Sequence, residues 1–270
     1  SVTQIETWMR DPYTIYARHI LELKALLPLD SAPDASDYGS LIHSILDEFN
    51  TQKENISLGN VLETLIEIGN KKFQKVVMYP SVKAFWWPRF LRMANWLVEF
   101  ESRRMNEVKN VCTEVQGELT IDSTVAPFKL TAIADRIEEL EDGELRIVDY
   151  KTGTLPSKKE ILAGFSPQLP LEALVAESGG FSGIKAKKVK SLEYWRLGGG
   201  NIAGEVSSLT GISTDLVMEA RKGLEALIGL FDDQETPYQA RPLPDVSPPY
   251  SDYEHLARVK EWSSFLGKEE

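Results

Sequence analysis

Apolar side chains recur three and four positions apart through the first hundred residues, which is the spacing of amphipathic helices. The segments with this spacing are residues 3–26, 38–50, 57–75 and 88–106. Asp11 followed by Pro12 is typical of a helix start, because aspartate caps the first N–H groups and proline suits the first turn. Pro88 predicts a further helix start. Residues 30–37, rich in Ser, Pro, Ala and Asp, predict a loop.

From Val111 onward the spacing changes to the alternation of β-strands. Strands are predicted at residues 113–121, 127–138, 144–151 and 189–197, and helices at residues 166–178 and 214–231. This order predicts an α/β fold in which a central mixed sheet is flanked by helices. We expect one domain over residues 1–270, with a helical N-terminal part (1–110), a core (111–200) and a C-terminal part (201–270). The C-terminal part would hold a helix, a proline-rich extended segment at 234–249 and a tail.

The predicted hairpin between residues 127 and 151 carries the most informative chemistry. Its turn, Glu141-Asp142-Gly143, tolerates the positive φ angles of a tight connection. One strand carries Asp135, and the other carries Asp149 and Lys151. Residues two apart on a strand point to the same face, so Asp149 and Lys151 can reach one site together.

Two carboxylates and a lysine suit a hard cation and a phosphate. Mg²⁺ binds through one or two carboxylates and keeps positions open for a substrate phosphate. Such an ion lowers the pKa of a bound water and polarises a phosphoryl oxygen, while an ammonium orients that water or offsets charge. The residues therefore predict phosphodiester hydrolysis in outline. On spacing alone, a solvated strand face is the commoner interpretation of Asp and Lys two positions apart.

The hairpin motifs belong to a larger set along the chain. The set comprises Gly39-Ser40-Leu41-Ile42-His43, Asp135-Arg136-Ile137-Glu138, Asp149-Tyr150-Lys151-Thr152-Gly153 and Gln168-Leu169-Pro170-Leu171. It resembles the RecB-type branch of the PD-(D/E)XK nucleases, the group that also contains Cas4. Members have patterns similar to Gly-x-x-x-His, Gly-x-x-Asp-Arg-Ile-Asp, Asp-Tyr-Lys-Thr-Gly and Gln-Leu-x-x-Tyr. Ala132 replaces the glycine of the second pattern, and Glu138 replaces its last aspartate.

The resemblance implies a restriction-endonuclease-like core and a role for each motif residue. It implies His43, Asp135 and Asp149 as metal ligands, joined by the Tyr150 main-chain carbonyl, with Lys151 as the catalytic lysine. Gln168 would steady the lysine, the water or the DNA backbone, and Glu114 falls where many members carry a glutamate near the metal. The expected ion is Mg²⁺, with Mn²⁺ as a substitute. Without the resemblance, His43 reads as a structural helix histidine and Gln168 as an ordinary helix-start residue.

The chain opens with Ser1-Val2-Thr3-Gln4-Ile5-Glu6-Thr7-Trp8, and its tail contains the stretch from Tyr250 to Trp262. These two ends are similar to the C-terminal nuclease region of AddB, the partner subunit in AddAB helicase-nucleases. Many AddB and Cas4 proteins hold an iron–sulfur cluster with four cysteines, one of them before a proline in the N-terminal helix. Here Asp11 precedes Pro12, and the only cysteine is Cys112. Four thiolates cannot be assembled, so we expect no iron–sulfur cluster. Packing of the tail through Tyr253, Leu256 and Trp262 against the N-terminal helix would replace it.

Charge and hydropathy limit the remaining functions. The net charge of −11 argues against a simple nucleic-acid-binding module, since DNA affinity comes largely from Lys and Arg. DNA would then be held mainly by another domain or partner. No apolar run approaches the ~20 residues that span a bilayer, so a cytoplasmic protein without a membrane segment is expected. Because the chain begins with Ser1, we expect a domain of a longer protein.

These observations predict an Mg²⁺- or Mn²⁺-dependent deoxyribonuclease of the exonuclease type. Its context would be an AddB-like subunit that cuts a single strand from an unwound duplex in double-strand break repair, together with an AddA-like helicase-nuclease subunit. One alternative is a nuclease-fold scaffold that binds DNA or a helicase partner without cleaving. Another is a stand-alone Cas4-like exonuclease, against which the missing cysteines argue.

Overall fold

The computed structural model describes residues 1–24, 26, 32–52, 60–74, 79–210, 214–244 and 251–266. Its centre is a five-stranded sheet in the order β1 (Val108–Ile121), β2 (Phe128–Leu140), β3 (Leu145–Lys151), β4 (Val189–Arg196) and β5 (Glu205–Thr210). Only β3 and β4 pair in parallel, and the other neighbours pair antiparallel. The prediction of a mixed sheet flanked by helices is therefore confirmed.

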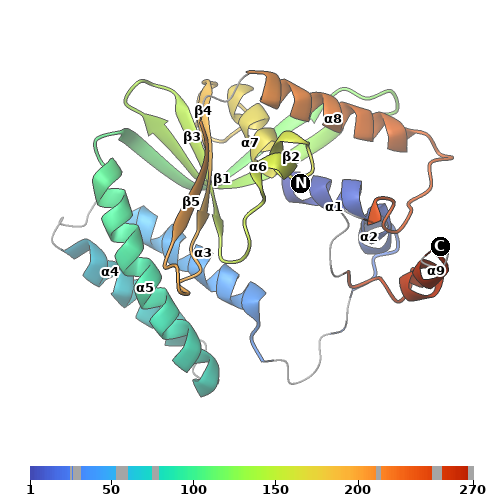
Figure 1. The fold of residues 1–270 in the computed structure, drawn as a ribbon. Helices are drawn as coiled ribbons and strands as arrows, with labels where there is room; N and C mark the ends of the chain where they lie inside the picture. Colours follow the sequence, from blue (N-terminus) through green and yellow to red (C-terminus); the bar gives the residue numbers. More distant parts are fainter. Residues whose placement is uncertain are drawn as a thin grey trace.

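Helices cover both faces of the sheet (Figure 1). The N-terminal helical elements are α1 (Val2–Arg10), α2 (Pro12–Ile15), a π-helical turn η1 (Tyr16–Ile20), α3 (Ala35–Gln52), α4 (Val61–Phe73) and α5 (Pro80–Arg104). Those that follow are α6 (Lys158–Leu162), α7 (Gln168–Glu177), α8 (Thr214–Asp232) and α9 (Val259–Leu266). None of the helices that the structure describes is long and apolar enough to cross a bilayer.

Two hydrophobic cores sandwich the sheet. Ile147 and Leu192 belong to the core shared with α1, α7 and α8, whereas Val148 and Trp195 belong to the core shared with α3, α4 and α5. Neighbouring residues of β3 thus pack on opposite faces, as expected for a strand buried on both sides. The residue pattern of β3 therefore fixes where its last residues, Asp149 to Lys151, emerge.

Several predicted boundaries differ from the structure. Helix α5 begins at Pro80, so the predicted start at Pro88 was wrong: Pro88 lies inside the helix. Pro88 has no N–H group to donate to the carbonyl of Ala84, one turn earlier. Both residues are exposed, so this carbonyl is on the side open to solvent and the helix tolerates the proline. The predicted helix at 3–26 is divided at Asp11, which takes the N-cap position of α2 before Pro12 but makes no capping hydrogen bond with its side chain.

Other differences concern the ends of predicted segments. Strand β5 was not predicted, because its residues are half-exposed at the edge of the sheet and lack a clear alternation. The predicted loop at 30–37 ends early, since α3 starts at Ala35. Parts of four predictions lie outside the described residues: 25 of the first helix, 30–31 of that loop, 57–59 and 75 of another helix, and 245–249 of the proline-rich segment.

The tail is attached to the N-terminal helices by hydrogen bonds. Tyr253 is buried and donates its hydroxyl to the Leu23 carbonyl at 2.7 Å. The Thr14 hydroxyl donates to Asp11 at 2.6 Å and lies 2.9 Å from the Ser251 hydroxyl. Leu256, by contrast, is 52 % exposed, so it does not take the packing role predicted for it. Asp11, which precedes Pro12, is thus the centre of a polar link between the tail and the N-terminal helices.

The turn after β4 fixes α5 against the sheet. Arg89 and Arg92 of α5 donate to the carbonyls of Gly198 and Gly199, each at 2.9 Å. Gly199 has a φ of +60°, and a Cβ atom there would overlap the Arg89 main-chain oxygen. This contact therefore requires glycine at position 199.

We expect Gly199→Ala to lower the free energy of unfolding by about 2–4 kcal/mol, through left-handed strain and the overlap with α5. Urea denaturation measures this change. Gly200→Ala is the matched control, because a Cβ atom at Gly200 meets nothing within 4 Å and its φ is not positive. It should change stability by less than about 0.5 kcal/mol. Equal losses in both variants would contradict the role of this contact.

Candidate metal and phosphate site

The alternation of side chains reverses at one point on both β1 and β2. In a regular strand, residues that face the same side are an even number of positions apart. Ala134 and Ile137 are three apart, yet both belong to the core shared with α7. The register places Glu114 opposite Asp135, and Glu114 has a φ of +48°. A positive φ at a residue other than glycine costs free energy and occurs at functional sites. The distortion brings the side chains of Glu114 and Asp135 together at the surface of the sheet.

His43 joins these two carboxylates from α3. Among the described residues, His43, Glu114 and Asp135 form a group whose potential ligand atoms all lie within 4.8 Å of one another. Gly39, one turn before His43, allows the close approach of α3, since a Cβ atom there would lie 3.1 Å from the Thr152 hydroxyl oxygen. The Gly-x-x-x-His spacing therefore places the imidazole over the end of β3.

The main chain of Tyr150 connects this group to β3. Its N–H donates to the Asp135 Oδ2 atom at 2.7 Å, and its carbonyl oxygen lies 3.0 Å from His43 Nε2. His43 Nδ1 lies 3.3 Å from Asp135 Oδ1. Two side chains and one carbonyl that the sequence predicted as metal ligands therefore meet at one place.

Asp149, Lys151 and Gln168 form a second group beside the first. Lys151 Nζ lies 3.0 Å from Asp149 Oδ1, 2.8 Å from Asp149 Oδ2 and 3.2 Å from Gln168 Oε1. Gln168 Nε2 donates to Asp149 Oδ1 at 2.5 Å. The spacing of two residues does bring Asp149 and Lys151 to one face, and α7 begins where Gln168 can reach both.

The donor set suits a hard divalent cation. Carboxylates, a carbonyl and an imidazole are the ligands that Mg²⁺ and Mn²⁺ accept. Asp149 lies outside the group of His43, Glu114 and Asp135, but its Oδ2 atom is buried and has no hydrogen-bond partner among the described residues, with only the Lys151 ammonium beside it. Lys151 is the one cationic partner described for this buried oxygen, so a bound cation would further stabilise the Asp149 carboxylate.

The titration of these groups follows from burial and crowding. Burial raises the pKa of Asp149 to about 6, and the Asp135 carboxylate adds to this, against the opposing Lys151 ammonium. Burial also raises the pKa of Glu114, with repulsion from Asp135 and Asp47. For His43, burial would lower the pKa, but the Asp135 carboxylate outweighs it and the pKa rises. Carboxylates that resist ionisation together favour a cation between them.

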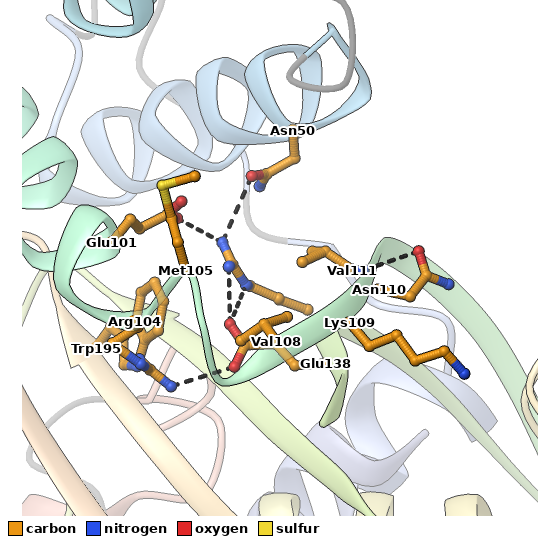
Figure 2. A pocket seen from close by; sticks show the side chains of 11 residues that line it. Asn50, Glu101, Arg104, Met105, Val108, Lys109, Asn110, Val111, Glu138 and Trp195 are labelled. Carbon is orange, nitrogen blue, oxygen red and sulfur yellow. Dashed lines mark hydrogen bonds and ion pairs between the residues drawn. The ribbon is translucent and has the colours of Figure 1, made fainter. Parts of the chain in front are cut away.

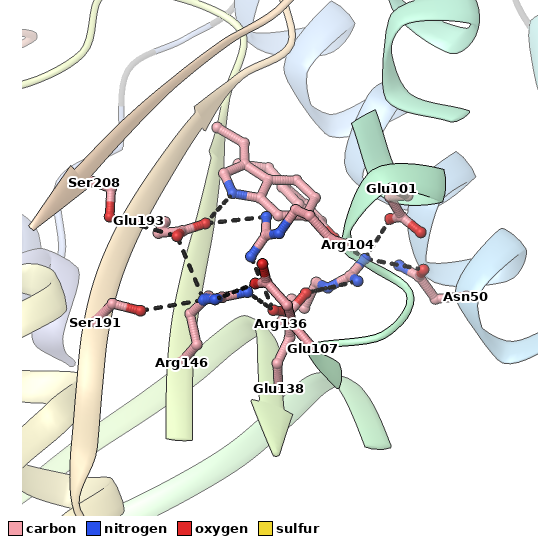
Figure 3. A network of polar contacts seen from close by, with 12 residues as sticks. Asn50, Glu101, Arg104, Glu107, Arg136, Glu138, Arg146, Ser191, Glu193 and Ser208 are labelled. Atoms are coloured by element: carbon pink, nitrogen blue, oxygen red, sulfur yellow. Dashed lines mark hydrogen bonds and ion pairs between the residues drawn. The ribbon is translucent and has the colours of Figure 1, made fainter. Parts of the chain in front are cut away.

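A buried ionic network lies between the strands of the site and α5 (Figure 3). Arg136, next to Asp135, is 3 % exposed and donates to Glu138 at 2.8 Å and to Glu101 of α5 at 2.6 Å. Its guanidinium also lies 3.5 Å from Asn50 of α3 and from the Tyr150 hydroxyl. Arg136 therefore ties the helix of His43 and the strand of Tyr150 to the same point.

Glu138 is the anion at the centre of this network. It accepts from Arg104 at 3.2 Å and from Arg146 at 2.9 Å, besides Arg136. Burial would raise the pKa of Glu138, but the three guanidinium groups outweigh it and lower the pKa. A pocket of about 230 Å³ opens beside the network, with Asn50, Glu101 and Trp195 among its lining residues (Figure 2).

Two buried residues of the site were missed from the sequence. Arg136 was noted only as part of a motif, although charged residues at 136, 138, 146 and 193 of predicted strands were a signal for a buried network. Glu172 is 1 % exposed and accepts from Gln168 Nε2 at 3.2 Å, and burial raises its pKa well above the usual range. Glu172 stands at the tyrosine position of the Gln-Leu-x-x-Tyr pattern. A carboxylate at that position was the available signal.

Comparison with known proteins shows the family of the chain. A family model for the PD-(D/E)XK nuclease superfamily matches residues 1–246, so the chain belongs to that superfamily. More particularly, the chain is distantly homologous to the nuclease region of AddB. An ATP-dependent helicase/deoxyribonuclease subunit from Clostridium perfringens is 29% identical over 201 residues, which cover 65% of this chain and 17% of that protein.

Uncharacterized rickettsial proteins are more similar in sequence. One from Rickettsia bellii is 34% identical over 182 residues, and one from Rickettsia conorii is 37% identical over 187 residues. Each match covers 67% of this chain and 22% of the relative. The match therefore spans about a fifth of the length of each of these relatives.

We expect Arg136→Met to lower the free energy of unfolding by about 3–5 kcal/mol, because it leaves Glu138 and Glu101 buried with fewer cationic partners. Thermal and urea unfolding measure the loss. Arg103→Met is the matched control on α5, where the arginine pairs with Glu99 at the exposed surface. That variant should unfold like the original chain. A stable Arg136→Met protein would show that the network is dispensable.

Mn²⁺ binding should weaken as the pH falls through about 6. Protons compete with the cation for Asp149, whose pKa burial raises to about 6, so the affinity should fall about tenfold per pH unit below that value. Calorimetric titrations between pH 5 and 7.5 measure this dependence. Asp142→Asn, in the exposed hairpin turn, should keep the same profile, whereas Asp149→Asn should bind weakly at every pH. An affinity that is constant over this range would contradict the assignment of Asp149.

Proposed function

We propose that this chain is a divalent-metal-dependent nuclease that hydrolyses phosphodiester bonds of DNA. The observation that carries the proposal is the meeting of two groups at the end of β3. One group offers ligands for a cation through His43, Glu114 and Asp135, and the other offers an ammonium through Lys151. A cation beside an ammonium is an arrangement that stabilises the negative charge of a five-coordinate phosphoryl transition state.

The residues divide into cation ligands and phosphate-facing groups. His43, Asp135, Asp149 and the Tyr150 carbonyl would hold Mg²⁺ or Mn²⁺, with Glu114 as a further carboxylate. When bound, such an ion polarises a phosphoryl oxygen and makes a bound water more acidic. The buried oxygen of Asp149 without a hydrogen-bond partner supports this role.

Lys151 orients the attacking water and offsets charge on the phosphate. Its Nζ atom donates to Asp149 and to Gln168. Because these two acceptors fix the ammonium, the direction of its third N–H bond is fixed as well. Burial would lower the pKa of Lys151, but the Asp149 carboxylate outweighs it and the pKa rises. Lys151 therefore serves as a cationic donor, and Gln168 keeps both groups of its side-chain amide engaged with the site.

The context that we propose is an AddB-like subunit in the resection of double-strand breaks. The match to the helicase/deoxyribonuclease of Clostridium perfringens supports this context. The net charge of −11 supports delivery of the strand by other parts of a longer chain and by an AddA-like helicase subunit. An exonuclease acting on the unwound single strand in the cytoplasm fits such a complex.

Cleavage of end-labelled single-stranded DNA by the full 270-residue chain tests the proposal, with Mg²⁺, Mn²⁺ or EDTA. We expect metal-dependent cutting that Asp149→Asn and Lys151→Met each reduce about 100-fold or more, as for the loss of other charge-stabilising groups. Lys190→Met is the matched control, since Lys190 pairs with Asp142 in the exposed hairpin turn. It should cut normally.

Three other results are informative. Cleavage that survives EDTA, or that Asp149→Asn leaves intact, would contradict the proposal. A chain that binds Mn²⁺ but cuts nothing would indicate that DNA delivery needs the missing partner. A chain that neither binds Mn²⁺ nor cuts would favour the nuclease-fold scaffold.

A further inference from the structure

A pocket of about 440 Å³ lies beside the candidate site, between α3, α5 and the residues that follow β3. Its lining includes Asp34 and Tyr38 at the start of α3, Trp86 and Arg89 of α5, and Thr152 and Gly153. Thr152 directly follows Lys151, and Tyr38 precedes His43 by five residues, ~7.5 Å along the helix axis. The pocket is therefore within about two nucleotides of a phosphate held at the site, at ~3.4 Å per nucleotide along a strand.

The wall of this pocket is aromatic. Trp86 is half-buried, and its ring meets the Tyr38 ring at a centroid distance of 5.2 Å, edge to face. Tyr38 is only 2 % exposed, so it supports Trp86 rather than offering a face of its own. A partly exposed indole held by a buried ring is a stacking platform for a flat ligand.

Polar groups of the same pocket have free hydrogen-bonding capacity. The Tyr38 hydroxyl is buried and has no hydrogen-bond partner among the residues that the structure describes. Burial raises the pKa of Tyr38 to about 12, so the hydroxyl remains a donor at neutral pH. Arg89 donates from Nε to Gly198, and its guanidinium carbon lies 5.0 Å from the centre of the Tyr38 ring. Its Nη atoms make no hydrogen bond or ion pair within the described part of the chain.

The start of α3 does not suit an anion. The Asp34 carboxylate accepts from the N–H groups of Ser36 and Asp37 at 2.7 and 3.1 Å, and the Asp37 carboxylate accepts from the Asp34 N–H at 2.9 Å. Two carboxylates therefore occupy the donors that a phosphate would need, and they repel it. A neutral, flat group with hydrogen-bond acceptors fits this pocket better than a phosphate does.

From these contacts we infer that the pocket holds one unpaired nucleobase of the DNA strand that is being cut, stacked on Trp86. Tyr38 and Arg89 donate hydrogen bonds to the edge of that base. A base paired in a duplex cannot enter, so the pocket makes the site selective for single-stranded DNA. This inference rests on the proposed nuclease function and adds a specificity pocket to it.

Binding of a fluorescein-labelled single-stranded oligonucleotide to the full chain in EDTA, followed by anisotropy, tests the inference. Trp86→Leu should bind about 5- to 100-fold more weakly, which is the usual range for the loss of one stacked base. Trp86→Phe should lie between Trp86→Leu and the original chain. Trp96→Leu is the matched control, because Trp96 stacks on Phe100 on the same helix, ~15 Å away. Trp96→Leu should bind the single strand as tightly as the original chain does. A duplex of the same sequence should bind all variants and the original chain equally, because its paired bases cannot enter the pocket.

Oligonucleotides with a single abasic nucleotide identify the base in the pocket. At one position near the cut, the abasic substrate should bind the original chain as weakly as the intact strand binds Trp86→Leu. The two changes together should cost no more than either alone, because they remove the same contact.

The outcomes separate this inference from the nuclease proposal. If the original chain cuts and binds single strands but Trp86→Leu does so equally well, or if Trp96→Leu loses as much, the pocket is not a base site and the nuclease proposal stands. If abasic and Trp86→Leu losses add, the base is bound elsewhere. If the original chain neither binds nor cuts single-stranded DNA, the pocket inference fails, and Mn²⁺ binding then decides between a nuclease that needs its partner and a nuclease-fold scaffold.

Discussion

The candidate site depends on the point where β2 and β3 stop pairing. Their ladder ends at Arg136 and Val148, so the next residues, Asp135 and Asp149, face each other without main-chain hydrogen bonds between them. The Tyr150 N–H nevertheless has an acceptor, because the Asp135 side chain takes the place of a strand carbonyl. A buried N–H group must be paired, so this bond holds Asp135 in one orientation. The Tyr150 carbonyl, on the other side of the same residue, is thereby turned toward His43.

Gathering carboxylates at this point has an electrostatic cost, because burial disfavours their charged forms. Asp149 is 2 % exposed and Glu172 is 1 % exposed, and burial raises the pKa of both. On the α5 side of the same strands, Arg136 joins two carboxylates and two helices. The fold therefore separates its buried charges into a balanced group that holds the elements together and an acidic group at the site. Only the acidic group gains from a cation.

The sequence predicted the parts of the site that depend on local spacing. Asp149 and Lys151 meet because residues two apart on a strand share a face, and Gly39 and His43 share a face because they are four apart on a helix. The reversal at Glu114 could not be predicted, since it depends on a strained φ that only the paired strands impose. The Arg136 network joins residues from α3, α5, β2, β3 and β4, and no periodicity encodes such distant partners. The predicted helix start at Pro88 was wrong because it, too, depends on the surroundings of the helix. A proline can lie inside a helix where the carbonyl one turn before it can face water.

The proposed action on DNA requires of this acidic chain a means of attraction other than charge. Phosphates are repelled by a protein of net charge −11, except where cations sit between the carboxylates of the site. Stacking of a base on an indole carries no such penalty, because the base is neutral and the gain comes from apolar and π contact. A pocket walled by Trp86, set next to an acidic cation site, would hold a strand by its base and leave the phosphate to the ion and Lys151. This division requires an unpaired strand, and a helicase is the kind of partner that produces one.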